Sequence, residues 1–266
     1  MKTNTFQSEI GNTSTIEMKN KVLSDDETKC IDVSNINDLI IAFNYLEMRG
    51  IEKDGCLPVL KTKPYLEIQY RITERKKREI QRSNIQLFGE DSRDLEASLD
   101  KFSIKTAKRK NAHKLAKMIV SGGLNIGLYI HCPKFQIGKT YLANAIVNGL
   151  ADKGFSGSFL FAPSFSRQAK DFPRLEERLK TLNQCDVLVI DDIGAEYRSD
   201  WFRIEILMPI LQHRLSRRKL TIFTSNYSID QLEALYRQQS QPVDVKRLMT
   251  RIRDLTEEIE IDDIGE

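Results

Sequence analysis

The sequence predicts an α/β fold in which a parallel sheet lies between two layers of helices. Short apolar segments bounded by turn residues recur from about residue 95 onward, as expected of strands buried on both faces. Segments with helical spacing separate them, and alternating strands and helices form crossovers between parallel strands. The expected strands are residues 126–131, 158–161, 187–190 and 220–223, with helices such as 105–120, 140–153 and 200–216 around them.

The region before this domain is expected to be small and differently built. Its first helix should span residues 34–49, because Leu39 and Phe43 fall on one face, Ser34 can cap the start and Gly50 can end it. An extended piece at 65–70 and a basic run at 71–82 follow. With a joint at 89–92, the predicted divisions are a disordered tail over 1–30, a small region over 31–92 and the α/β domain over 93–266.

The composition limits the classes of protein to consider. The chain has 266 residues, 40% of them hydrophobic and 30% charged, with a net charge of only +3, so any nucleic-acid surface must come from local clusters. No segment approaches the roughly 18 apolar residues of a membrane span, and the first thirty residues do not resemble a signal peptide. The four cysteines form no CxxC pair. We therefore expect a cytoplasmic protein with reduced thiols and no membrane partner.

The sequence Gly138-Lys139-Thr140 follows an expected strand and opens an expected helix. Backbone N–H groups at a helix start attract phosphate oxygens, the lysine reaches the β and γ phosphates, and the hydroxyl is a ligand for Mg²⁺. This predicts a P-loop for ATP and Mg²⁺. The usual pattern has glycine where this chain has Pro133, so the alternative is a strand-to-helix turn that has lost nucleotide binding.

Two further strands end in polar residues that suit the same chemistry. Asp191 and Asp192 follow an apolar strand, where the first can hold Mg²⁺ and the second can polarise the attacking water. Asn226 ends the next strand, where it can position that water. The alternatives are solvated acids at a strand end and ordinary turn chemistry.

A basic segment near the end of the chain offers an arginine finger. Arg247 and Arg251 are four residues apart on one helical face, with apolar side chains on the other. A guanidinium aimed at the phosphates of a neighbouring copy stabilises charge in the transition state. The alternative is a solvated helix face.

Taken together, these segments resemble the DnaC/DnaI branch of AAA+ helicase loaders, with the IstB transposition helper as close kin. The resemblance runs from about residue 95 to about residue 256, and Asp-Asp-Ile-Gly-Ala-Glu at 191–196 is its most specific string. The other matching segments are residues 127–131, 138–142, 223–226 and 247–253, together with Trp201.

The resemblance implies a P-loop AAA+ domain that binds ATP and Mg²⁺, and it assigns roles to particular residues. Asp192, Asn226 and Arg251 are the catalytic group, and Thr140 and Asp191 hold Mg²⁺. The residues implied in nucleotide binding are Gly138, Lys139, Thr140, Tyr141 and Arg247.

The resemblance also implies a function and partners. It implies an ATP-dependent loader that places a DnaB-like replicative helicase on single-stranded DNA during initiation or restart, binding the helicase through residues before about 90. Self-assembly into oligomers and contacts with other initiation proteins belong to the same expectation. Candidate DNA contacts are Phe165, Arg167, Lys170, Tyr197 and Arg198.

Two departures from the family pattern keep alternatives open. The P-loop has lost its first glycine and is one residue longer, which predicts weak ATP hydrolysis. Residues 70–77 stand where DnaI relatives carry a cysteine-rich zinc module, and they contain no cysteine. The alternatives are a non-hydrolysing adaptor that only tethers the helicase, and an IstB-like transposition helper.

Overall fold

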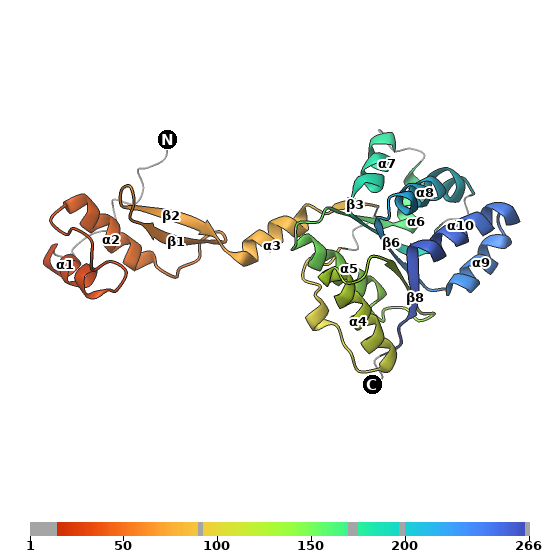
Figure 1. Cartoon of the computed structure of the whole chain (residues 1–266), viewed down its shortest axis with the longest axis horizontal. Coiled ribbons are helices and arrows are strands. Elements are labelled where there is room, and N and C mark those ends of the chain that lie inside the picture. The colour runs from red at the N-terminus through yellow and green to blue at the C-terminus, as the bar shows by residue number, and fades with distance from the viewer. Residues whose placement is uncertain (1–14, 90–92, 170–174, 197–199, 264–266) are drawn as a thin grey trace. The chain divides into compact units, whose positions relative to one another are not determined.

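The computed structural model describes residues 15–89, 93–169, 175–196 and 200–263 (Figure 1). The chain forms two compact units, Met1–Lys77 and Arg78–Glu266. The boundary therefore falls inside the basic helix α3 (Glu74–Ser83) and not at residues 92 and 93 as expected. The reason is β3 (Gln86–Phe88), a short strand that the sequence analysis did not anticipate. It pairs with the sheet of the larger unit and brings the residues after α3 into that unit.

The larger unit is built on a sheet of six strands that are all parallel, in the order β3-β5-β6-β7-β4-β8. This confirms the predicted α/β class with a parallel sheet. The four expected strands are all present, although the sequence analysis missed β8 as well as β3. The strands after β3 are β4 (Gly127–His131), β5 (Gly157–Phe161), β6 (Val187–Ile193), β7 (Leu220–Ser225) and β8 (Thr256–Glu260).

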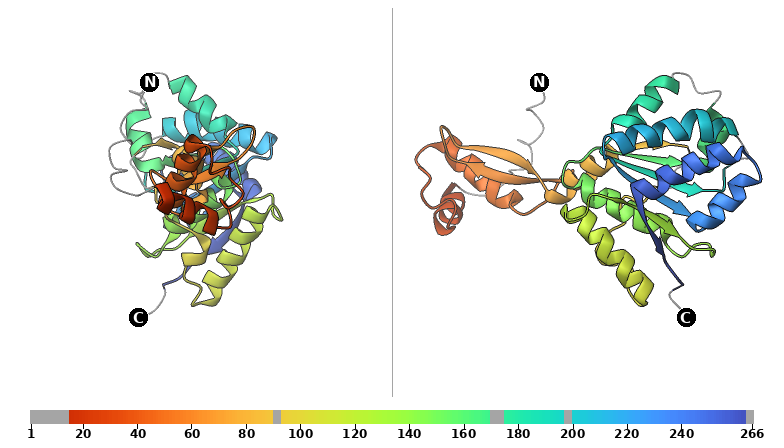
Figure 2. Two further views of the ribbon diagram at one scale, coloured as in Figure 1. Left: turned by 90° about the vertical axis from the view of Figure 1, so that its left-hand side faces the viewer. Right: turned by 45° about the vertical axis from the view of Figure 1, so that its right-hand side comes forward.

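Helices cover both faces of this sheet, which gives the expected three layers (Figure 2). Successive strand residues alternate between the two cores: Val187 and Val189 pack on one face, and Leu188 and Ile190 on the other. One face carries α4 (Ala107–Ser121) and α5 (Lys139–Ala151). The other carries α6 (Ala162–Gln168), α7 (Leu175–Gln184), a π-helical turn (Phe202–Leu207) that leads into α8 (Met208–Ser216), α9 (Ile229–Arg237) and α10 (Pro242–Leu255).

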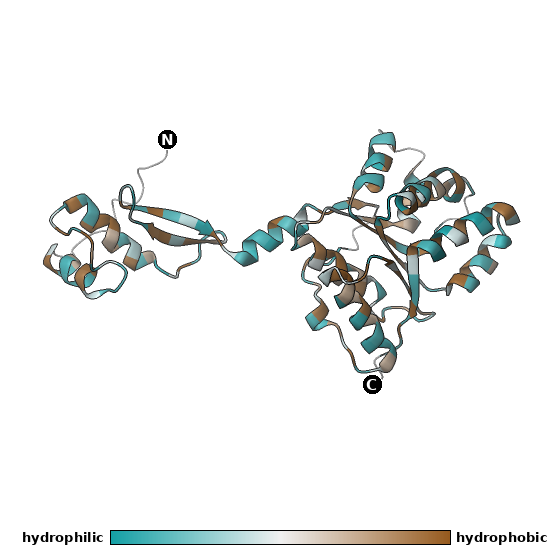
Figure 3. Ribbon diagram, in the orientation of Figure 1, coloured by the Kyte–Doolittle hydropathy of each residue, from teal (hydrophilic) through white to brown (hydrophobic). Residues whose placement is uncertain are grey.

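The hydropathy of the residues follows these layers. The strands of the larger unit are largely hydrophobic, and α3 is almost entirely hydrophilic (Figure 3). None of the residues of α3 is buried, so this helix contributes little to either core. Within the described ranges, no helix combines the length and the apolar character that crossing a membrane requires.

The smaller unit contains two helices and a two-stranded antiparallel sheet. These are α1 (Thr15–Ser24), α2 (Ile36–Met48), β1 (Cys56–Lys61) and β2 (Glu67–Ile72). The expectation of a disordered tail is wrong for α1, because Met18 and Val22 bury their side chains against Leu39 and Phe43. Residues 1–14 lie outside the described ranges. The expected helix at 34–49 is present as α2, but Asn35 rather than Ser34 caps it, with its side chain accepting from Asn37 N.

Close backbone packing ties the end of α10 to the sheet at Gly127, the first residue of β4. A Cβ atom built there would lie 1.7 Å from the carbonyl oxygen of Thr221 and 3.1 Å from that of Leu255. Only glycine fits this position without moving backbone. The amino end of β4 is thereby fixed against both β7 and the end of α10.

Candidate nucleotide site

The carboxyl ends of β4, β7 and β6 lie side by side in the sheet, and the predicted polar residues follow them. β4 leads through residues 132–137 into Gly138, which has φ +95° and forms the N-cap of α5. Glycine adopts this left-handed conformation readily, whereas other residues are strained there. No side chain of the described residues caps this helix start. Its N–H groups are therefore directed at an open position that suits an anion.

Lys139 is almost completely buried, at 8% exposed, and it organises the loop around its ammonium group. Nζ donates to the carbonyl oxygens of Cys132 at 3.2 Å and Lys134 at 2.9 Å, and to Oδ1 of Asn226 at 2.8 Å. Burial lowers the pKa of Lys139 below its usual value, and the nearby Asp192 carboxylate opposes that shift. A phosphate beside Nζ would favour the charged form further.

Asp191 lies at the end of β6, and two hydroxyl groups hold its carboxylate. Oγ1 of Thr140 donates to Oδ1 at 2.9 Å, and Oγ1 of Thr224 donates to the same oxygen at 2.6 Å. Asp191 is only 2% exposed. The first turn of α5 and the ends of β6 and β7 thus meet at one carboxylate oxygen.

Asp192 has a left-handed backbone, with φ +58°, which is unusual for a residue other than glycine. Its N–H donates to Oγ1 of Thr224 at 2.9 Å, and Nδ2 of Asn226 donates to its Oδ1 at 3.3 Å. Burial raises the pKa of Asp192, and the Lys139 ammonium partly offsets this. A partly buried carboxylate with a raised pKa is a candidate for accepting a proton from water.

The residues present fit a magnesium nucleotide. A hydroxyl and a carboxylate, on Thr140 and Asp191, lie 2.9 Å apart beside an uncapped helix start and a buried lysine. Oxygen ligands of this kind suit Mg²⁺, and the lysine and the helix start suit phosphates. The structure brings six of the predicted site residues together: Gly138, Lys139, Thr140, Asp191, Asp192 and Asn226.

Three other predicted residues lie elsewhere. The hydroxyl of Tyr141 interacts with the backbone of Ser98, and its ring stacks on Phe102. Nε of Arg251 donates to Oε1 of Gln212 at 2.8 Å, and Arg247 is exposed one turn earlier on α10. Because α10 ends beside the start of β4, it runs toward the amino edge of the sheet, away from the chain's own site.

The candidate DNA contacts are only partly described. Phe165 packs in the core between α6 and the sheet and is fully buried, so its expected exposure on a DNA-facing loop is wrong. Its ring contacts Phe88 and Phe202. Arg167 is exposed. Lys170, Tyr197 and Arg198 lie outside the described residues.

Arg109 contacts the backbone of the phosphate loop, and the sequence analysis did not identify it. Its side chain is 3% exposed in a helix rich in exposed lysines, and it donates to the carbonyl oxygen of Ile137 at 2.8 Å. The guanidinium also lies 4.3 Å from the centre of the Phe102 ring. Nothing in the sequence distinguishes Arg109 from the basic residues around it. Thr224 was likewise not assigned a role, although it belongs to the Thr-Ser-Asn string that ends β7.

A second buried network fixes the segment that follows Asp192. Glu196 accepts from the hydroxyl of Tyr236 and, at 2.6 Å, from the N–H of Gly194. Arg203, in the π-helical turn, lies 4.8 Å from the centre of the Tyr236 ring. Burial raises the pKa of Glu196. The turn after β6 is therefore attached to α9 through a carboxylate that the protein almost completely encloses.

Removing either partner of this pair should destabilise the protein. Glu196→Ala leaves the Tyr236 hydroxyl buried without its acceptor, and Tyr236→Phe leaves Oε1 of the carboxylate without the hydroxyl that donates to it. Each should lower the free energy of unfolding by about 1–3 kcal/mol in urea titrations. The double variant should lose less than the sum of the two, because the partners interact. Strictly additive losses would show that the pair is not coupled.

Pro133 lies at the exposed start of the phosphate loop, where it supplies no N–H. Pro133→Gly restores a possible donor, so we expect tighter nucleotide binding in a fluorescent-nucleotide titration. One charge-assisted hydrogen bond corresponds to about 1.5–3 kcal/mol, or roughly ten- to a hundredfold in affinity. Pro58→Gly, in the smaller unit, is the control for a general effect of losing proline. Unchanged affinity would show that the loop already supplies every donor the phosphates need.

No protein-family model matches the sequence. The replicative helicase loader DnaI of Bacillus subtilis (strain 168) is 40% identical over 147 residues, which are 53% of this chain and 47% of DnaI. The replicative helicase loader DnaC of Escherichia coli (strain K12) is 28% identical over 144 residues, which are 52% of this chain and 58% of DnaC. The chain thus spans about half the length of the curated relatives it matches.

A solved structure matches a larger share of the chain. The crystal structure of DnaI superposes with a TM-score of 0.61 at 35% identity, covering 68% of this chain and 98% of that one. The fold and the cluster around Lys139 define a P-loop protein of the AAA+ class. With this similarity, the chain belongs to the DnaC/DnaI family of replicative helicase loaders.

Proposed function

We propose that this protein is an ATP-dependent loader that places a replicative helicase on single-stranded DNA. The observation that carries the proposal is the connected cluster of Lys139, Thr140, Asp191, Asp192 and Asn226 at one edge of the sheet. Relatives named as replicative helicase loaders support the choice of partner. We therefore propose that the protein acts in the cytoplasm.

Each member of the cluster has a proposed task in ATP hydrolysis. Lys139 and the start of α5 hold the phosphates, and Thr140 and Asp191 hold Mg²⁺, which would neutralise phosphate charge. Asp192 accepts a proton from the attacking water, and Asn226 orients that water. These residues supply the groups that ATP hydrolysis needs, except for a positive charge opposite the γ-phosphate. Arg251 of a second copy, with Arg247 beside it, is the proposed source, so hydrolysis depends on oligomers.

The smaller unit is the proposed helicase-binding region because it exposes many large apolar side chains. On β2 and just before it, Tyr65, Tyr70 and Ile72 are 73%, 56% and 51% exposed. Ile51 adds a further side chain that is 61% exposed. Apolar groups gathered on so small a unit favour a protein partner that covers them.

Co-purification with the replicative helicase of the source organism, with and without ATP, tests the proposal. The unaltered chain should retain the helicase, and Tyr70→Ser/Ile72→Ser should retain much less. Val243→Ser, which changes an apolar residue of the larger unit that is 62% exposed, is the control. Absence of helicase in the wild-type eluate under both conditions would reject the loader function.

A further inference from the structure

A long basic groove borders the amino edge of the sheet, opposite the nucleotide site. It consists of two cavities of about 860 and 820 Å³. The first lies among α3, a 3-10 turn (Leu99–Lys101), α4 and α5, and the second lies at the starts of β4, β6 and β7. Both are lined by Val120, Ser121 and Lys153, so the two cavities adjoin, and we call the pair the amino-edge groove. Each cavity has the volume of a typical small-molecule pocket, roughly 300–1,000 Å³, and the two together exceed it.

The groove concentrates positive charge. Eight lysines and arginines line it against four aspartates, so its excess is larger than the net charge of +3 of the whole chain. Such a local field attracts a polyanion. The cations are Arg78, Arg82, Lys114, Lys117, Lys153, Arg217, Arg218 and Lys219, and the anions are Asp100, Asp152, Asp186 and Asp254.

Three of these cations form hydrogen bonds or ion pairs with other groups of the protein. Arg82 pairs with Asp152 at 2.6 Å, and the ammonium groups of Lys153 and Lys219 donate at 2.6 Å to the carbonyl oxygens of Val120 and Gln184. Cations that bind carbonyl groups at helix ends have an ordinary structural role. These three side chains therefore do not argue for a ligand.

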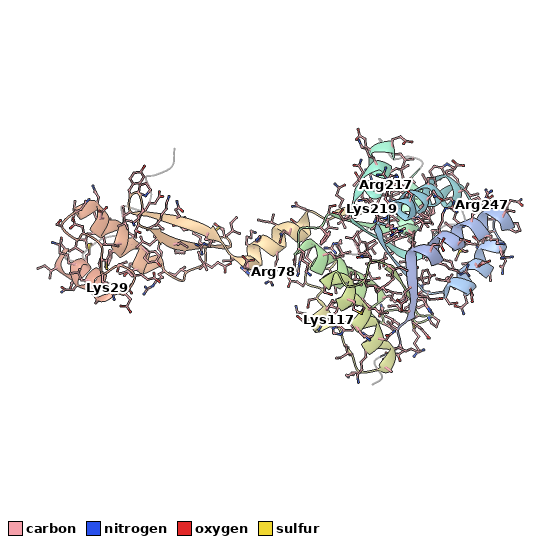
Figure 4. The ribbon with its side chains drawn as sticks, in the orientation of Figure 1. Lys29, Arg78, Lys117, Arg217, Lys219 and Arg247 are labelled. Atoms are coloured by element: carbon pink, nitrogen blue, oxygen red, sulfur yellow. The ribbon has the colours of Figure 1, made fainter. Side chains whose placement is uncertain are left out.

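The other cations of the groove make no close bond to the residues that the structure describes. The side chains of Arg78, Lys114, Arg217 and Arg218 have no hydrogen-bond or ion-pair partner within the described parts of the chain. Lys117 is 4.0 Å from the exposed Asp100. Figure 4 labels Arg78, Lys117 and Arg217, which come from α3, α4 and the turn after α8. Unpaired cations along a groove are available to neutralise phosphates.

An aromatic ring in the same groove indicates which polyanion fits. Phe155 is 49% exposed and lines the second cavity together with Arg217 and Arg218. An exposed ring among cations matches a single strand, whose bases stack on aromatic side chains while its phosphates follow the positive groups. An acidic peptide would use the cations but has no need of the ring.

We propose that the amino-edge groove binds single-stranded DNA, with phosphates on Arg78, Lys114, Lys117 and the Arg217–Arg218 turn and a base on Phe155. The inference rests on the proposed function, because it names a surface for the DNA that a loader must hold. It adds a DNA contact on the edge of the sheet opposite Lys139.

Salt-dependent binding of fluorescein-labelled oligodeoxythymidine to the full chain tests this groove. Losing two phosphate contacts should make the slope of log affinity against log salt shallower by about 1.4. The variant Lys114→Gln/Lys117→Gln should show this change, and Phe155→Ala should weaken binding about fivefold or more with little change in slope. The control Lys29→Gln/Lys246→Gln removes two exposed lysines outside the groove. Thermal unfolding of each variant checks that the fold is retained.

The outcomes separate this inference from the proposed function. Wild-type binding with an unchanged slope in Lys114→Gln/Lys117→Gln overturns the groove and leaves the loader function standing. If a groove variant binds DNA normally but no longer retains the helicase, the groove binds an acidic protein surface instead. That result also overturns the inference. A wild-type chain that binds no oligonucleotide, alone or with the helicase, rejects both.

Discussion

Lys139→Ala is expected to abolish ATP binding in a fluorescent-nucleotide titration. Lys139 is the buried cation of the phosphate loop, and its ammonium group holds the loop carbonyls of Cys132 and Lys134 together with Asn226. Alanine removes both the charge that faces the phosphates and the group around which the loop folds. One charged hydrogen bond is worth about 1.5–3 kcal/mol, and this change removes several contacts together.

The same loop provides a matched control. Lys134 is two-thirds exposed, and its ammonium group lies 3.3 Å from Asp263 instead of inside the loop. Lys134→Ala should therefore bind nucleotide nearly as well as wild type, because only its backbone carbonyl meets Lys139. Equal affinities for wild type and Lys139→Ala would disprove the P-loop assignment.

Arg251→Ala is expected to keep nucleotide binding and to lose the ATPase activity that assembly stimulates. α10 ends at the amino edge of the sheet, so Arg251 lies away from its own site, where its guanidinium donates to Gln212 and to the carbonyl oxygen of Arg247. We expect it to exchange these bonds for the phosphates of a neighbouring copy. A finger of this kind meets charge that develops in the transition state, so its loss affects turnover by about 10³-fold or more while ground-state binding changes little. Phosphate release in the presence of single-stranded DNA and the helicase measures this effect.

Mixing two inactive variants tests whether the finger acts between copies. Arg251→Ala keeps the acids, and Asp192→Asn keeps the arginine, so an oligomer containing both should regain part of the activity. Arg253→Ala is the control on the same helix, because Arg253 pairs with Asp230 and Glu233 of its own chain. Normal turnover by Arg251→Ala, or an inactive mixture of variants that still assemble, would make Arg251 an ordinary surface residue.

The sequence predicted the sheet and the central site because both depend on local patterns. Buried parallel strands are nearly continuous apolar runs, and the polar residues at their ends meet because the strands are neighbours. Asp191 and Asn226 could be placed in this way without knowledge of any side-chain contact. The finger role of Arg247 and Arg251 came from their helical spacing and from the resemblance, and that of Tyr141 from the resemblance alone. The chemical roles of all the site residues remain predictions.

Features that depend on contacts between distant segments could not be read from the sequence. β3 is three residues long and exists because β5 offers it an edge. Phe165 follows a strand, as a loop residue would, but the packing of α6 buries it. Arg109 and Glu196 are charged residues that resemble surface positions until the fold encloses them. Burial of such residues depends on tertiary partners and leaves no periodic signal.

The close backbone contact at Gly127 connects the phosphate loop and the proposed arginine finger of the same copy. The strand that begins at Gly127 ends at the phosphate loop, and the helix that ends at Leu255 carries Arg251 one turn earlier. Because no side chain separates the two backbones at Gly127, we expect the strand and the helix end to move as one rigid body. In an oligomer, a shift at one copy's phosphate loop would thus displace the finger that the same copy offers to its neighbour. In the proposed oligomer, the contact between β4 and the end of α10 is therefore the route by which we expect nucleotide state to reach the neighbouring subunit.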